Sequence, residues 1–439
     1  MKHANAKCLL NFVIVNLFMI SAMSCAGSSA GFDTVESDKD RIESSNIDEA
    51  QLNQLVADNT DFAFDMYHQL NYEEDNLFFC PHSISLALAM TCAGANGETA
   101  DQIKQALRFT LPQEELHSAF NALDLALTER DADNKKLDLE ILNSLWGQKD
   151  YPFLSSFLDT LALYYGAGFN TLDFVGDPEG SCAIINEWVS DCTEGRIQEA
   201  IPPGQLDNIA TLVITNAVYF KAAWKYPFNE KLTRDAAFNL LDGSEIMVPM
   251  MYLSGNQHCD TGDTYEEPML NYTQGDDYQV LELPYDGDLS MVFLLPDEGM
   301  FVDVESRLDG EMVRGMLEDL QSTKVHKVSV PKFSSEPDRL RLKEILSELG
   351  MPSAFIAGVA DFSGIDGTRD LWIDDVYHKT YISIDEEGTE ASASTVVVLT
   401  KYSLRDSLAI TLDRPFIYMI QDMETNAILF VGRIMDPSL

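Results

Sequence analysis

The chain has 439 residues, which is enough for one large domain or for two to three ordinary ones with an ample buried core. Hydrophobic residues make up 46% of it and charged residues 23%, ordinary values that exclude wholesale disorder, collagen and coiled coil. Its 72 acidic residues and 29 lysines and arginines give a net charge of −43. Such a surface repels phosphate backbones and anionic lipid headgroups, so we expect no nucleic-acid partner.

The N-terminus is typical of an export signal. Lys2 and Lys7 precede an apolar run over residues 9–23, which is shorter than the roughly 20 residues that span a bilayer. Residues 22–25 (AMSC) resemble the bacterial lipobox, in which the cysteine, here Cys25, is acylated. We predict a lipoprotein signal over residues 1–24, with an ordinary signal and an incidental cysteine as the alternative.

A flexible acidic tether is expected to follow the signal over residues 25–50, which are rich in Gly, Ser and acidic residues and have no apolar periodicity. The expected location is the bacterial cell envelope, on the outer-membrane or periplasmic side, or else the medium. Contact with a membrane is expected only through the lipid on Cys25.

Cysteine spacing does not indicate a disulfide framework or a metal site. Cys182 and Cys192 lie ten residues apart in one predicted helix, about 15 Å along its axis, whereas a disulfide needs Cα atoms within about 7 Å. No CxxC pair, zinc-protease motif, calcium loop or nucleotide-binding glycine loop occurs. We therefore predict free thiols, no metal, no cofactor and no enzymatic active site.

Helical patterns dominate the first half of the chain. Apolar residues at helical spacing predict a helix over residues 51–70, and residues 84–93, apolar on all sides, predict a buried helix. Thr99 and Gln102 form a capping-box pattern that predicts the start of another helix. A further helix is expected to include residues 186–189.

Strand patterns dominate the second half. Eight β-rich segments are predicted, at residues 211–220, 278–283, 289–295, 324–330, 381–384, 408–411, 416–421 and 427–431. Helices early, antiparallel strands later and no regular alternation indicate an α+β fold. No linker or internal repeat divides residues 51–439, so we expect one domain there.

Several blocks in a fixed order resemble the serpin family from residue 59 to residue 437. Residues 76–99 (NLFFCPHSISLALAMTCAGANGET) are similar to a characteristic family block, with Cys80 in place of the usual serine. Residues 414–416 (RPF) and 430–432 (FVG) match the closing signature. The resemblance implies a monomeric protein in which helices pack on a large mixed β-sheet beside further sheets, with an exposed reactive-centre loop at about residues 386–408.

The resemblance also implies structural residues where the main sheet opens. Residues 215–221 (TNAVYFK) and Trp224 are similar to the strand that leads to the upper opening. His378 is similar to the histidine of the central opening region, with Ser83 and Asn216 as expected neighbours. We interpret these four side chains as packing and hydrogen-bonding residues without a catalytic role.

The segment before the loop has the composition of a hinge. From Thr389 to Leu399 every second residue is small or apolar, and a strand would place them on one face, suited to burial under a covering helix. Gly388 permits a sharp change of backbone direction. The hinge residues expected from the pattern and the resemblance are Glu386, Gly388, Thr389, Ala391, Ala393 and Thr395.

This hinge implies, through the resemblance, a suicide-substrate inhibitor that traps a serine protease as an acyl-enzyme and inserts its cleaved loop into the main sheet. Papain-like cysteine proteases are a second target class. The alternative is a non-inhibitory serpin acting as a binding or chaperone-like protein. The absence of proline from residues 386–401 favours inhibition.

The bond attacked is predicted from the hinge register. The resemblance implies that the residue before the scissile bond is the seventeenth when the hinge glutamate, here Glu386, is counted as the first. That residue is Tyr402, so we predict cleavage of the Tyr402–Ser403 bond. An aromatic residue there suits chymotrypsin-like and subtilisin-like proteases. Lys401 and Arg405 are alternative sites for a trypsin-like enzyme.

Overall fold

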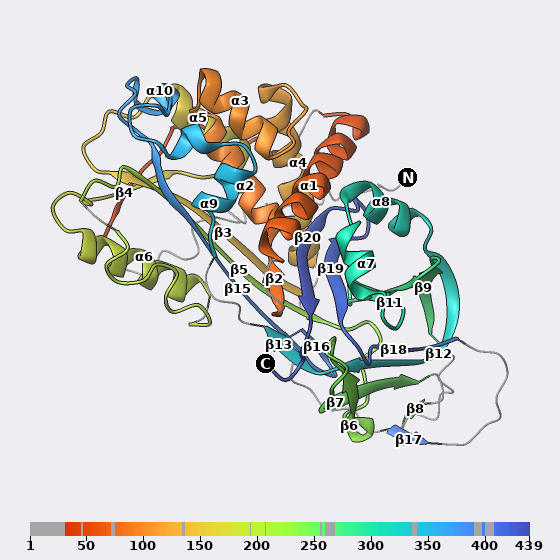
Figure 1. Cartoon of the computed structure of the whole chain (residues 1–439). Helices are drawn as coiled ribbons and strands as arrows, with labels where there is room; N and C mark the ends of the chain where they lie inside the picture. Colours follow the sequence, from red (N-terminus) through yellow and green to blue (C-terminus); the bar gives the residue numbers. More distant parts are fainter. Residues whose placement is uncertain are drawn as a thin grey trace, which may run out of the picture.

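Two large β-sheets and a group of helices organise the chain (Figure 1). The computed structural model describes residues 31–44, 47–71, 75–133, 137–193, 195–206, 208–254, 257–259, 268–335, 340–389, 397–399 and 408–439. The predicted α+β class with a large mixed sheet is confirmed.

The first sheet carries the hinge. Its described strands run in the spatial order β1 (Asp33–Val35), β4 (Phe169–Leu172), β3 (Leu137–Gln148), β5 (Leu212–Ala223), β16 (Gly388–Thr389), β15 (Ile373–Ile384) and β13 (Phe333–Ser335), and β14 (Leu340–Arg341) also pairs with β15. Pairing of β3 with β4 and of β5 with β15 is parallel, so the expectation of antiparallel strands holds only in part. We call this sheet the main sheet.

The second sheet packs beside the main sheet and extends below it in Figure 1. Its described strands run in the order β2 (Leu77–Phe79), β20 (Ile428–Ile434), β19 (Phe416–Asp422), β11 (Leu289–Pro296), β10 (Tyr278–Pro284), β9 (Met269–Gln274), β12 (Gln321–Pro331), β7 (Glu245–Ser254) and β6 (Arg234–Asn239), with β18 (Leu408–Thr411) parallel to β12. A separate pair joins β8 (Gln257–Cys259) to β17 (Val397–Leu399).

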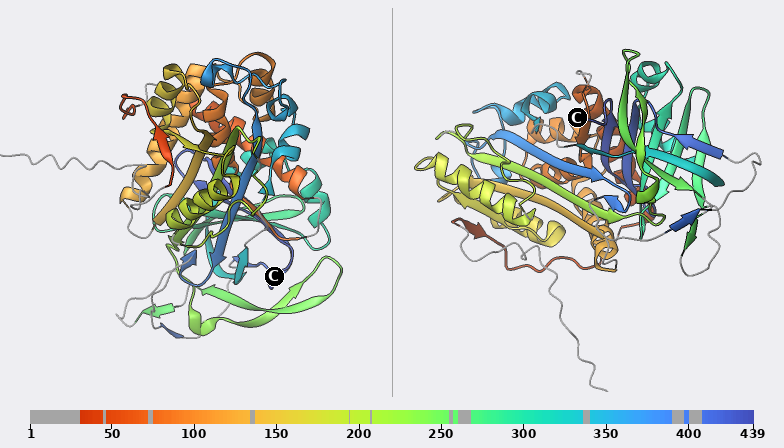
Figure 2. Two further views of the ribbon diagram at one scale, coloured as in Figure 1. Left: turned by 90° about the vertical axis from the view of Figure 1, so that its left-hand side faces the viewer. Right: turned by 90° about the horizontal axis from the view of Figure 1, so that it is seen from below.

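The helices cover both faces of the main sheet. Helix α6 (Pro178–Cys192) crosses one face, and most of the others lie on the opposite side or at its upper end (Figures 1 and 2). These others are α1 (Glu49–Leu70), α2 (Pro81–Cys92), α3 (Gly97–Ala106), α4 (Gln113–Asp133), α5 (Ser155–Tyr165), α9 (Lys343–Glu348) and α10 (Ser363–Asp366), with α7 (Phe301–Ser306) and α8 (Gly310–Glu318) on the second sheet and short 3₁₀ turns at Glu230–Leu232 and Pro352–Phe355. None of the helices in the described part of the chain is long and apolar enough to cross a membrane.

Most predicted elements are confirmed, with shifted ends. Every residue of α2 is buried, as its continuous apolar run predicts. Strand β3 is missing from the sequence-based assignment, although it spans the main sheet beside β5. Helix α1 begins at a true capping box formed by Asp48 and Gln51.

The capping box predicted at Thr99 and Gln102 is wrong. Helix α3 begins after Asn96, and both side chains instead accept backbone N–H groups from a distant segment. The Thr99 hydroxyl accepts from Asp361 and the Gln102 carbonyl from Ser353, each at 3.0 Å. The tertiary contacts replace the local cap.

Part of the expected tether lies against the domain. Strand β1 adds to the free edge of β4, and the Arg41 guanidinium pairs with the Asp124 carboxylate at 2.6 Å. Residues 31–44 are therefore not a free linker, whereas Cys25 and the signal lie outside the described residues. Cys80, Cys92, Cys182 and Cys192 are buried free thiols, as predicted.

Three histidines are enclosed by the fold and held neutral. Burial lowers the pKa of His82 to about 4, of His117 to about 4 and of His378 to about 3. In the unfolded chain each titrates near 6.5, so below that pH the unfolded state binds more protons than the folded state. The free energy of unfolding is therefore not reduced by these histidines above pH 6.5, and it falls as the pH drops from 6.5 toward 4.

We predict that acidification from pH 7.5 to 5.5 lowers the contribution of these three histidines to the free energy of unfolding, by on the order of 1 kcal/mol each. Urea unfolding at the two pH values measures this. Neither ring nitrogen of His82 has a hydrogen-bond partner in the described structure, so His82→Leu keeps the packing and removes about one third of the pH dependence. An identical pH dependence in parent and variant contradicts the assignment.

Candidate functional site

The hinge lies inside the main sheet as the two-residue strand β16. Gly388 pairs with Ala223 and Thr389 with Ala222 on β5, while Thr389 also pairs with Ile384 on β15. Further along the sheet β5 and β15 pair directly with each other, from Ile373 to Tyr381 on β15. Figure 1 places β16 at the lower end of this sheet, next to β13 and β7. The sheet is thus held open at one end and closed along the rest of its length.

A tight turn directs the chain from β15 back into the sheet. The Asp385 carboxylate accepts the N–H groups of Glu387 at 2.9 Å and Gly388 at 3.1 Å, and the Asp385 N–H donates to the Gly388 carbonyl. Burial raises the pKa of Asp385 above its ordinary value. Gly388 has φ +157°, and an added Cβ would lie 2.0 Å from the Ala222 carbonyl oxygen. The close backbone approach therefore requires glycine here, a reason additional to the change of backbone direction expected from the sequence.

Thr389 rests on a stack of two aromatic rings. Its side chain is fully buried, and its hydroxyl lies 2.9 Å from the Tyr285 hydroxyl. The Tyr285 ring stacks on Trp224 with centroids 4.5 Å apart. The Trp224 indole N–H donates to the Asp385 carbonyl at 3.0 Å, and its backbone N–H donates to the Glu387 carbonyl. Trp224 therefore lies where the sheet opens, as expected, and its hydrogen bonds support the turn.

Glu386 fixes the start of the hinge to the second sheet. Its carboxylate pairs with the Lys332 ammonium at 2.5 Å and accepts the Thr233 hydroxyl at 2.6 Å, and its carbonyl accepts the Phe228 N–H. Burial alone would raise the pKa of Glu386, but Lys332 and Thr233 hold it below its ordinary value. The carboxylate is charged at neutral pH and holds the turn in place.

The buried face of the hinge differs from the expected one. Thr389 lies directly opposite Ala222 and Ile384, which belong to the large core on the side away from α6. Helix α6 covers the other face, where it packs on residues such as Val213 and Ala217. Burial of Thr389 is confirmed, but it faces the core between the two sheets rather than a covering helix.

Ser83, Asn216 and His378 meet on the closed part of the sheet, as expected. The Asn216 side-chain oxygen accepts the Ser83 hydroxyl at 2.8 Å and the His378 Nδ1–H group. His378 Nε2 accepts the Cys80 N–H at 3.1 Å, so Nδ1 carries the proton. With a pKa of about 3, His378 is neutral and joins β5, β15 and the start of α2.

The other predicted site residues lie outside the described residues: Ala391, Ala393, Thr395, Lys401, Tyr402, Ser403, Arg405 and Cys25. The backbone of residues 397–399 is described as strand β17, which pairs antiparallel with β8. In the described part of the chain no group of His, Cys, Asp and Glu residues is arranged to hold a metal ion.

Sequence reasoning missed Tyr285, Lys332 and Thr233. The hydroxyl of Tyr285 meets Thr389 across 104 residues of chain, and Thr233 meets Glu386 across 153. No spacing pattern joins residues so far apart. A tyrosine at the end of a β-rich segment was the only local signal.

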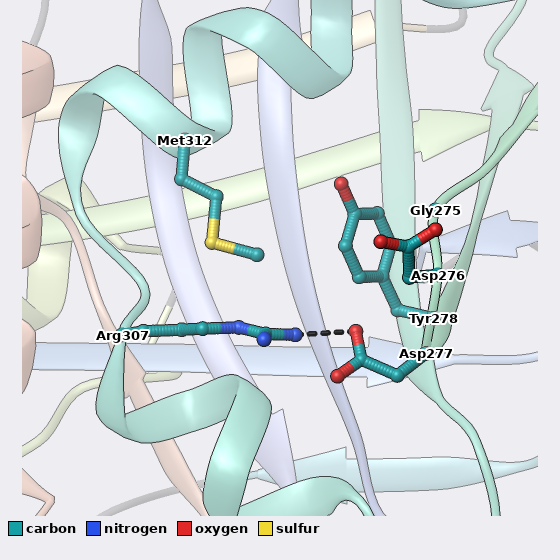
Figure 3. Close-up of a pocket in the computed structure, with 6 residues that line it drawn as sticks. All are labelled: Gly275, Asp276, Asp277, Tyr278, Arg307 and Met312. Atoms are coloured by element: carbon teal, nitrogen blue, oxygen red, sulfur yellow. Dashed lines mark hydrogen bonds and ion pairs between the residues drawn. The ribbon is translucent and has the colours of Figure 1, made fainter.

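A surface hollow of about 300 Å³ lies elsewhere, between the β9–β10 turn and the α7–α8 connection (Figure 3). Its lining residues are Gly275, Asp276, Asp277, Tyr278, Arg307 and Met312. The Arg307 guanidinium is already paired with the Asp277 carboxylate. None of the predicted site residues that the structure describes lines this hollow, so we assign it no part in the site.

A main sheet opened at one end by the first residues of a loop, and closed along the rest of its length with a Ser–Asn–His cluster on the closed part, defines a protein of the serpin class. The sequence profile of that family, described as serine protease inhibitor, matches residues 57–437. The chain belongs to the serpin family.

Individual proteins of this family are similar to the chain over most of their length. The chain is 38% identical over 395 residues to an uncharacterized serpin-like protein of Thermococcus kodakarensis, covering 89% of this chain and 88% of that one. It is 35% identical over 387 residues to the leukocyte elastase inhibitor of Xenopus laevis, covering 86% and 98%. The crystal structure of the thermophilic serpin tengpin in its native state matches with a TM-score of 0.78 at 27% identity, covering 92% of this chain and 99% of that one.

We predict that Gly388→Val expels β16 from the sheet, because its side chain would occupy the position of the Ala222 carbonyl. Amide hydrogen exchange of residues 384–389 should accelerate at least about tenfold. Gly315→Val is the matched control, since nothing lies within 4 Å of its Cβ position on α8. Unchanged exchange in the hinge of Gly388→Val contradicts the close approach.

Proposed function

We propose that the chain inhibits serine proteases by presenting the segment between β16 and β18 as a substrate and then inserting it between β5 and β15. The observation that carries this proposal is β16 itself, since Thr389 already pairs with both of these strands and Gly388 pairs with β5. Relatives named as inhibitors, such as leukocyte elastase inhibitor, support the same activity. The residues that follow Thr389 can therefore add to the same two strands by extending β16.

The mechanism follows from the two states of this segment. The protease serine attacks the scissile carbonyl and forms an ester, and the C-terminal part of the loop leaves as a free amine. The freed end then extends β16 through the sheet and carries the attached protease with it. About a dozen new backbone hydrogen bonds at ~1 kcal/mol net each give on the order of 10 kcal/mol. This is enough to disturb a catalytic centre that depends on close alignment.

Insertion must part β5 from β15 beyond β16. Their direct pairing ends at Tyr219 and Tyr381, next to the hinge, and includes the His378–Asn216 contact. A strand entering between them replaces each lost backbone hydrogen bond with pairing on both of its edges. The polar Ser83–Asn216–His378 cluster thus opposes spontaneous opening until cleavage frees the loop.

The expected target is a serine protease of the chymotrypsin or subtilisin type that cleaves after aromatic residues. The register from Glu386 assigns Tyr402 to the position before the scissile bond. Incubation with a protease panel, followed by denaturing electrophoresis, tests the function. A covalent band that resists denaturant supports inhibition. Cleavage without a complex favours a non-inhibitory binding protein instead.

We predict that a chymotrypsin-like protease releases a C-terminal peptide beginning at Ser403. Mass spectrometry of the trapped mixture identifies the peptide. Tyr402→Ala should slow complex formation with this protease, because a methyl group leaves the deep apolar pocket of the protease unfilled. A peptide beginning at Tyr402 or Asp406 with every protease tested overturns the register.

We predict that Thr389→Arg turns the inhibitor into a substrate. Thr389 is fully buried against Tyr285, and burial of an unpaired guanidinium costs several kcal/mol, which slows insertion so that hydrolysis of the acyl-enzyme wins. The stoichiometry of inhibition should rise at least about tenfold while cleavage stays fast.

Thr389→Ser is the matched control, because it keeps a small side chain and the hydroxyl opposite Tyr285. Its stoichiometry should stay near that of the parent. An unchanged stoichiometry in Thr389→Arg would mean that this residue does not lead the insertion.

We propose further that the protein is exported and anchored through acylated Cys25, on the basis of the signal and the lipobox-like residues 22–25. Cys25→Ala should move the protein from the membrane fraction to the soluble fraction. Equal partitioning of both forms argues against the anchor.

A further inference from the structure

Two cations beside the hinge lie against an aromatic ring instead of a carboxylate. The Arg234 guanidinium of β6 lies 4.6 Å from the centre of the Tyr252 ring, and the Lys327 ammonium of β12 lies 4.9 Å from it. Neither forms an ion pair with a carboxylate in the described part of the chain. Other cations, such as Arg41, Arg314 and Arg433, do.

Strand register places the three side chains on one face. Arg234 pairs with Met250, two residues from Tyr252 on β7, and Lys327 pairs with Ser254, two residues further on. Arg234 is exposed, and Tyr252 and Lys327 are half-buried. Cation–π contact holds both charges in place while leaving them able to bind an anion.

This surface lies between the points where the loop is attached. Thr233, the neighbour of Arg234, binds Glu386 at the entry to the loop. Lys327 lies opposite Ala409 of β18, where the loop returns. Strand β8, which holds β17 of the loop, begins three residues after β7 ends (Figure 1). The surface therefore lies beside both points at which the loop joins the described sheets.

We propose that Arg234, Tyr252 and Lys327 form a docking surface for an acidic patch of the attacking protease, a proposal that rests on the inhibitory function above. The chain as a whole carries a charge of −43 and repels acidic proteins at long range. Two cations beside the loop weaken that repulsion where the protease must approach. The surface selects for acidic proteases by speeding their association.

The test compares cationic and anionic isoforms of chymotrypsin, which share a preference for aromatic residues. Association rate constants for covalent complex formation are measured with the full chain and with Arg234→Glu/Lys327→Glu. The double variant should slow association with the anionic isoform about tenfold at low salt, with little change for the cationic isoform. The stoichiometry of inhibition should not change, and the difference should vanish in 1 M NaCl.

Matched variants separate local from global charge. Lys39→Glu/Lys149→Glu makes the same change in net charge at two exposed sites outside this sheet and should leave the ratio of the two rates unchanged. Arg234→Gln/Lys327→Gln should give an intermediate effect, and Tyr252→Phe, which keeps the ring, none.

Three outcomes overturn the proposal: unchanged rates in Arg234→Glu/Lys327→Glu, equal slowing with both isoforms, or the same effect in the Lys39→Glu/Lys149→Glu control. Loss of dextran sulfate binding in the first variant with unchanged protease rates would make the surface a polyanion site, which also overturns it. If the parent chain forms no covalent complex with any protease, the inhibitory function itself fails, which is a distinct result.

Discussion

The structure depends on one close backbone contact, the approach of Gly388 to the carbonyl of Ala222. That contact lets a two-residue strand enter between β5 and β15, where no side chain beyond hydrogen would fit. Asp385 shapes the turn, and Trp224 and Tyr285 form the floor on which Thr389 rests. At the opening, the carboxylate of Asp385 and the indole and backbone N–H groups of Trp224 pair with the backbone of the turn, which lowers the cost of keeping the two strands apart.

A few residues further along the main sheet, β5 and β15 are not separated. There β5 and β15 pair directly, and neutral His378 and Asn216 bridge them to α2 through Ser83 and the Cys80 backbone. Each of these buried polar groups has a partner, and the partners lie on elements that must separate if a strand enters. An open end stabilised by apolar burial thus lies beside a closed length stabilised by polar contacts, so the two parts of one sheet resist strand separation to different degrees.

How much of the site the sequence predicts depends on the range of its contacts. Gly388 and Thr389 follow from a local pattern of a glycine and small residues, Glu386 follows from the resemblance to the serpin family, and all three lie at the opening of the sheet. The partners that hold them, Tyr285 and Lys332, sit on strands remote in sequence and carry no local mark. The capping pattern at Thr99 and Gln102 failed for a related reason, because distant backbone N–H groups took both side chains.

The sequence by itself determined which residues are buried in the elements that are apolar throughout, such as α2, and it predicted that Thr389 is buried on one face of a strand. Helical and strand periodicities follow from backbone geometry alone, so they are readable in any chain. Only the tertiary structure decided which face that is. Both faces of the main sheet are covered, one by α6 and one by the core around Ala222, and a period of two cannot distinguish them. The contacts of Thr389 with Tyr285 and Ile384 place it on the face toward the core, and these contacts exist only once the two sheets have come together.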